Sequence, residues 1–193
     1  MKTIKYLIPI MALFLTVSCE SDDDDFYNTI HVLTDNLVTI ETQSDYEVGD
    51  FLKVTADVPR LITEAGQANQ LDVRASTGNA SHFVFSYYLE RKNAANEWEF
   101  LDLTGNVVVN EGSGTAGSFV QAQAVYNGLA DAYLFDGDIE LMQPGAYRLT
   151  FGSDMSANRV ELVSASEGNN ITLNISSTVV GADNAGSYYF TVN

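Results

Sequence analysis

Short runs in which apolar and polar residues alternate constrain this chain more than any other feature. In the clearest run, Phe83 to Glu90, every second residue from Phe83 to Leu89 is large and apolar. Phe51 to Val58 alternates in the same way, and Pro59 ends it. Successive side chains of a strand point to opposite faces, so each run predicts a strand with one buried face.

Similar patterns recur along the rest of the chain. Further strands are expected at residues 29–33, 37–40, 71–74, 98–103, 119–126, 132–141, 147–151, 160–163, 171–175 and 188–192. Thr34-Asp35-Asn36 separates the first two of these runs, and Asn127-Gly128 predicts a turn between two later ones. Glu111 to Gly117 reads as a flexible loop. The pattern predicts one helical turn, at Leu61 to Glu64.

About ten strands at short spacing with no long helix predict an all-β fold. We expect a single antiparallel β-sandwich, immunoglobulin-like or jelly-roll-like, with a barrel as the alternative. One local pattern occurs twice, in Gly145 to Phe151 and in Gly186 to Val192: a loop glycine is followed by a strand that is entered through tyrosine. This pattern resembles the closing strand of bacterial immunoglobulin-like modules, which favours the sandwich. The length suits one buried core, so residues 29–193 are expected to form one domain.

The first residues have the features of an export signal. Lys2 and Lys5 precede an apolar run from Tyr6 to Val17, and Cys19 follows. This run is too short for a transmembrane helix, which needs about 20 residues. Cys19 is the only cysteine, so it has no partner within the chain for a disulfide. We therefore expect a signal peptide at 1–18, and a lipidated Cys19 with an acidic tether at 19–28.

Two short motifs carry a resemblance to a known class. Leu15-Thr16-Val17-Ser18-Cys19 resembles a bacterial lipobox, and Ser21-Asp22-Asp23-Asp24-Asp25 resembles the acidic export signal of Bacteroidota surface lipoproteins. The resemblance implies acyl chains, such as palmitate, on Cys19 and a place on the outer face of the outer membrane. Two or more such chains make attachment stable. The body resembles other uncharacterised flavobacterial β-sandwich lipoproteins, which implies no activity.

Charge and motif content exclude several function classes. The chain has 26 acidic against 9 basic residues, a net charge of −17, which argues against nucleic acid and anionic lipid as partners. The two histidines, His31 and His82, lie in no catalytic motif, and no Gly-x-Ser-x-Gly elbow occurs. Gly112, Gly114 and Gly117 lack the Lys-Ser/Thr of a nucleotide loop. We expect no enzyme activity and no cofactor.

Three acidic residues could form a carboxylate site. Asp136, Asp138 and Glu140 are spaced by two, which places them on one face of a strand. Calcium takes several oxygen ligands, but the spacing and glycine of a calcium loop are missing. A solvated strand face is therefore preferred over a metal site. The same trio could serve a glycan hydrolase only if two acids face a cleft.

Three aromatic residues are candidates for sugar stacking. Tyr88 and Tyr189 fall on the polar phases of their strands, and Trp98 begins another strand. Their rings are candidates for a polysaccharide platform, with packing at sheet edges as the alternative.

The sequence thus predicts a non-enzymatic binding or accessory subunit, held at the outer membrane by acyl chains on Cys19, with an outer membrane protein complex as a candidate partner. One alternative is a glycan-binding accessory protein of a polysaccharide uptake system. A carboxylate-dependent glycan hydrolase is a second, and a structural coat a third.

Overall fold

The computed structural model describes residues 28–193 apart from 65, 152–157 and 166–170. The expected signal peptide, Cys19 and the acidic run Ser21 to Asp25 lie outside the described residues. Of those described, 64% are in strands and 3% in a helix, so the all-β prediction is confirmed. The elements are β1 (Asn28–Glu41), β2 (Phe51–Pro59), β3 (Leu61–Thr63), β4 (Gln70–Asp72), α1 (Val73–Ser76), β5 (His82–Lys92), β6 (Trp98–Phe100), β7 (Val107–Glu111), β8 (Ser113–Ala116), β9 (Val120–Asn127), β10 (Ala132–Glu140), β11 (Gly145–Phe151), β12 (Arg159–Ser164), β13 (Ile171–Val180) and β14 (Ser187–Val192).

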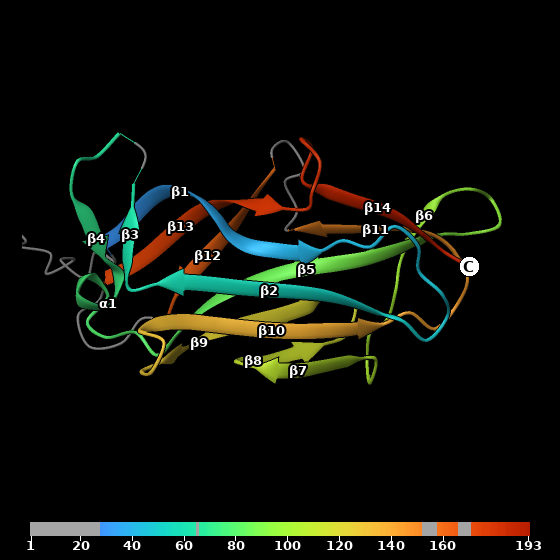
Figure 1. Cartoon of the computed structure of the whole chain (residues 1–193), viewed down its shortest axis with the longest axis horizontal. Helices are drawn as coiled ribbons and strands as arrows, with labels where there is room; N and C mark the ends of the chain where they lie inside the picture. Colours follow the sequence, from blue (N-terminus) through green and yellow to red (C-terminus); the bar gives the residue numbers. More distant parts are fainter. Residues whose placement is uncertain (1–27, 65, 152–157, 166–170) are drawn as a thin grey trace, which may run out of the picture.

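The single β-sandwich predicted from the sequence is wrong. The main sheet closes into a seven-strand barrel in the order β5-β12-β13-β1-β2-β10-β9, and β9 returns to pair with β5 (Figure 1). The pairing of β1 with β13 is parallel, with Asn28 opposite Ile171, so the sheet is not purely antiparallel either. Alternation gives each strand one buried face in a sandwich or a barrel, so it cannot tell whether the sheet closes.

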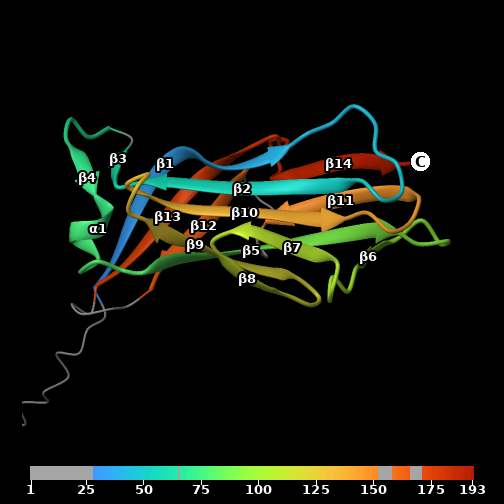
Figure 2. The same ribbon diagram turned by 60° about the horizontal axis from the view of Figure 1, so that its bottom comes forward.

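The closure depends on β5, which changes neighbours along its length. Its first half pairs with β9, from His82 opposite Val125 to Tyr87 opposite Val120, and near its start also with β12. Its second half pairs with β11 and β6 instead. The barrel is therefore closed where β5 begins, and opens into an added sheet, β6-β5-β11-β14, where β5 ends (Figure 2).

The two ends of the barrel carry different structures. β1 begins at the end where α1, β3 and β4 gather, and β6 and the C-terminus lie at the opposite end (Figure 1). Because β6 pairs with the last residues of β5, the added sheet belongs to the end away from α1.

The sheet also opens between β9 and β10, which pair only near their connecting turn. Beyond that turn the two strands separate, and β7 pairs with β10 while β8 pairs with β9. The chain reverses between β7 and β8 at Gly112, whose φ is +81°. A Cβ there would lie 2.5 Å from Gln123 O and 2.7 Å from Leu134 O, so only glycine fits.

The barrel is filled by inward side chains at alternate positions. Phe83 packs edge-on to Tyr133 at 4.8 Å between ring centroids, and Phe85 packs edge-on to Phe135 at 5.5 Å. Gly137 also faces inward, and a Cβ there would lie 2.6 Å from the Phe135 ring. The Phe135 ring therefore lies over Gly137 of its own strand and takes the space that a side chain at this position would need.

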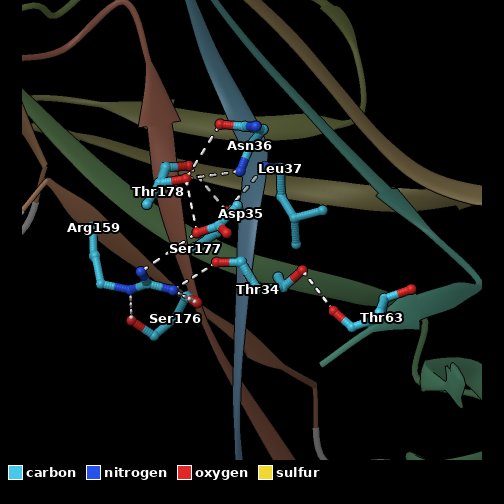
Figure 3. Close-up of polar contacts among 9 residues, drawn as sticks. All are labelled: Thr34, Asp35, Asn36, Leu37, Thr63, Arg159, Ser176, Ser177 and Thr178. Atoms are coloured by element: carbon cyan, nitrogen blue, oxygen red, sulfur yellow. Dashed lines mark hydrogen bonds and ion pairs between the residues drawn. The ribbon is translucent and has the colours of Figure 1, made fainter. Parts of the chain in front are cut away.

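A bulge interrupts β1 where the sequence predicted a break between two strands. Register shifts between Thr34 and Val38, so three residues of β1 lie opposite Thr178 of β13. Side chains replace the missing ladder bonds: Leu37 N donates to the buried Ser177 Oγ at 2.9 Å, and Arg159 donates to Thr34 O at 2.6 Å (Figure 3). The predicted break is thus a bulge inside one long strand.

Other local predictions are corrected around α1. Leu61 to Glu64 was expected to form a helical turn, but Leu61–Thr63 is β3 and pairs with β4. The helix lies instead at Val73–Ser76, where Asp72 Oδ1 accepts from Ala75 N and caps it. In the described part of the chain, no helix is long and apolar enough to cross a membrane.

Candidate functional site

The added sheet brings together all three aromatic residues that the sequence singled out for sugar stacking. We call its outer surface the aromatic face, with members Tyr88, Lys92, Trp98, Phe100, Phe119, Arg148 and Tyr189. Strand register explains the gathering, because Phe100, Glu90, Arg148 and Tyr189 lie opposite one another across β6, β5, β11 and β14. Residues two positions along a strand share this side, which adds Tyr88, Lys92 and Trp98.

One cluster on the aromatic face is built around Trp98. Its ring centroid lies 5.7 Å from that of Tyr189, and Tyr189 is 51% exposed. The Arg148 guanidinium lies 4.9 Å and the Lys92 ammonium 5.2 Å from the Trp98 ring centroid. These cation–π contacts hold the indole in place. Trp98 is half-buried, so Tyr189 offers the more open ring.

A second cluster is built around Tyr88. Its ring lies 5.4 Å from Phe100 and 5.6 Å from Phe119 between centroids. Phe100 is 56% exposed and Phe119 38% exposed. Large aromatic rings left open side by side are uncommon on a surface with no binding role.

An ion pair beneath the face fixes its geometry. Arg148 Nε and Nη2 donate to the Glu90 carboxylate at 2.7 and 2.6 Å, a bidentate arrangement. Glu90 is only 3% exposed, so its charge depends on Arg148. The hydrogen bonds to Glu90 raise the pKa of Arg148 further, and the cation stays in place at all ordinary pH values.

A groove continues from the aromatic face at Tyr189. It has a volume of about 630 Å³ and runs between β14 and the segment from Thr42 to Asp45. Its lining includes Gln43, Ser44 and Asn193 together with the aromatic residues of β14. Flat rings beside hydroxyl and amide groups are the combination that pyranose rings require, since a sugar has apolar faces and a polar rim.

The acidic trio does not form an open carboxylate site. Lys53 Nζ lies 3.4 Å from Asp136 Oδ2 and 4.0 Å from Asp138 Oδ1. Asn110 Nδ2 donates to both carboxylates, at 3.1 and 2.7 Å. Coulombic attraction to Asp136 raises the pKa of Lys53, so the lysine stays charged and balances one of the two negative charges. Among the described residues, no group of three or more acidic, histidine or cysteine side chains could hold a metal ion.

Glu140, the third acid, lies two residues beyond Asp138 on β10 and takes no part in these contacts with Lys53 and Asn110. It lines a cavity of about 100 Å³ together with Asp102 and Arg91. Hydrogen bonds from Thr104 lower the pKa of Asp102, so this carboxylate stays ionised and cannot act as the acid of a hydrolase pair. His31 and His82 lie on β1 and β5, which β12 and β13 separate in the barrel.

Sequence reasoning found three members of the aromatic face and missed four. Phe100 could have been found, because it lies two residues after Trp98 on the same strand. Lys92 could also have been found, because it lies four residues after Tyr88 on the same side of β5. Phe119 and Arg148 join the face only through pairing of β5 with distant strands, which no local pattern signals.

Comparison of the chain with protein-family models, with curated proteins and with solved structures found no match.

Proposed function

We propose that this protein is a non-enzymatic saccharide-binding or accessory protein, held at the cell surface by a lipid anchor. The observation that carries the proposal is the gathering of Tyr88, Trp98 and Tyr189 with the exposed Phe100 and Phe119 on one face. Their rings could equally have packed under loops. Instead Phe100 and Tyr189 leave about half their surface open, beside a polar groove.

Binding is favoured over catalysis because two carboxylates of the acidic trio that could have served a hydrolase already have partners. Asp136 and Asp138 are occupied by Lys53 and Asn110. A hydrolase requires one acid protonated and one free to attack or activate water, with both facing the substrate.

The anchor belongs to the same proposal and rests on the sequence pattern around Cys19. Acyl chains there would hold the protein to the membrane, and Asp22 to Asp25 would direct it outward. The aromatic face lies at the end of the barrel opposite the start of β1 (Figure 1), so the tether would leave from the far end.

The binding proposal is tested by a glycan array followed by calorimetry on the best ligand. Tyr189→Ala and Phe100→Ala should each weaken binding about tenfold, as expected when a stacking ring worth about 1.4 kcal/mol is lost. Phe51→Ala is the matched control, because Phe51 is 45% exposed but lies on β2, outside the aromatic face. Equal losses in all three variants, or an array with no signal, would refute saccharide binding through this face.

The anchor has a separate test. Cys19→Ser should release the protein from membranes. Replacing Asp22 to Asp25 with alanine should leave it membrane-bound but shielded from a surface-labelling reagent. Continued membrane retention of Cys19→Ser would contradict lipidation, and undiminished labelling of the alanine variant would show that the acidic run is only a spacer.

A further inference from the structure

Within the described residues, almost all the cations of this acidic protein are committed to internal partners. The described part holds seven of the nine lysines and arginines. Four of them form ion pairs: Lys53, Arg60, Arg148 and Arg159. Arg74 lies 3.8 Å over the Tyr126 ring, and Arg91 donates to Gln143.

Lys92 is different. Within the described ranges, no carboxylate lies within ion-pair distance of its ammonium, whose one recorded contact is the Trp98 ring at 5.2 Å. It follows Arg91 on β5 and lies opposite Trp98 on β6, so its charge is presented on the aromatic face. The charge of Arg148 beside it is balanced by Glu90, which leaves the Trp98 cluster with one uncompensated positive charge.

An uncompensated cation within the aromatic cluster selects for charge in the ligand. The Trp98 and Tyr189 rings lie 5.7 Å apart and Lys92 lies 5.2 Å from Trp98, so one bound sugar unit can touch the rings and the ammonium together. A hexuronic acid carries its carboxylate on the rim of the ring, where it meets a cation beside the stacking surface. A neutral sugar would leave Lys92 without a counterion.

We infer that the aromatic face binds an acidic saccharide of the uronate class, whose ring lies against Tyr189 and Trp98 and whose carboxylate pairs with Lys92. This inference rests on the proposed saccharide-binding function and narrows it to a ligand class. The preference works against the net charge of −17, which repels polyanions at long range. Added salt screens this long-range repulsion before it weakens the short-range contact with Lys92. We therefore expect the affinity to be highest at intermediate ionic strength.

The test compares hexuronate tetrasaccharides (galacturonate, glucuronate, mannuronate and guluronate) with their methyl esters, which have the same rings and no charge. Calorimetry should show about fivefold tighter binding of the acid form of the recognised sugar at 0.15 M salt, the size of an exposed ion pair. Lys92→Met should bind the acid and its ester equally. Lys92→Arg should keep the preference, which separates loss of charge from loss of packing on Trp98.

The outcomes distinguish this inference from the function on which it rests. Equal binding of acid and ester by the unaltered protein would overturn the acidic ligand and leave saccharide binding intact. A preference for the acid that survives Lys92→Met would overturn the role of Lys92. Absence of binding to every acid and every ester, with a positive array for neutral glycans, would overturn the uronate class. Absence of binding to any saccharide would overturn the proposed function as well.

Discussion

Gly112→Ala tests how closely the turn between β7 and β8 packs against β9 and β10. Two costs are expected. At φ +81° a residue with a Cβ is strained relative to glycine by about 1–2 kcal/mol. The new Cβ would also meet Gln123 O at 2.5 Å and Leu134 O at 2.7 Å. Both are backbone atoms, so the strands themselves must move, at about 1–3 kcal/mol. The free energy of unfolding should fall by about 2–5 kcal/mol in all.

Gly105→Ala is the matched control for this experiment. Gly105 has the same φ of +81°, but a Cβ there would have nothing within 4 Å. The free energy of unfolding of Gly105→Ala should therefore fall only by the cost of backbone strain at positive φ, about 1–2 kcal/mol. Urea unfolding of both variants, followed by circular dichroism, measures the difference. Equal losses would refute the reasoning, because they would show that β9 and β10 do not close on Gly112.

Three further changes test the packing elsewhere. Ser177→Ala should cost about 1–3 kcal/mol in urea unfolding, because it leaves a buried N–H of the β1 bulge without its acceptor, and no loss would show that the bulge re-forms around it. Arg148→Met should cost about 3–5 kcal/mol by leaving the buried Glu90 unpaired, and adding Glu90→Leu should recover most of that, whereas additive losses would contradict a coupled pair. The hydrogen bond from Arg60 lowers the pKa of Asp72, so the carboxylate's contribution is present above its ordinary pKa and lost as pH falls through the lowered value. Asp72→Asn keeps the cap, so its deficit against the unaltered protein should hold above about pH 5 and shrink below about pH 4, and a deficit independent of pH would contradict the charge effect.

Local patterns predicted the strands well because the alternation of apolar and polar residues within a strand reflects which of its faces is buried. Phe83 to Glu90 alternates, and its apolar phase is buried in the barrel as expected. Thr34-Asp35-Asn36 was correctly identified as an interruption, but its outcome as a bulge depends on Ser177 and Thr178, which lie about 140 residues away in the chain. Propensity could not supply those partners.

Neither the closure of the sheet nor the aromatic face could be predicted from local patterns, because both depend on pairing between strands that are distant in the chain. The barrel depends on β5 pairing with β9 and β12 over one half and with β6 and β11 over the other, and no pattern within β5 marks the change. Gly112 was assigned to a flexible loop, although its place between two strands is what requires glycine. Strand phase correctly placed Tyr88 and Tyr189 on the outer side of their strands, but Tyr88 is half-buried, and its contacts with Phe100 and Phe119 follow from the pairing of β5 with β6 and β9.

The fluorescence of Trp98 is the most direct measurement of the central claim, that the aromatic face is where saccharide binds. Trp98 is the only tryptophan of the chain, so its emission reports on this face alone. Titration with a saccharide bound on the array should change the emission with the same dissociation constant as calorimetry and should protect Trp98 from quenching by acrylamide. Tyr189→Ala should shift both responses to about tenfold higher saccharide concentration, and Phe51→Ala should leave them unchanged. Saccharide binding in calorimetry with unchanged emission and unchanged quenching would place the ligand elsewhere and contradict the account.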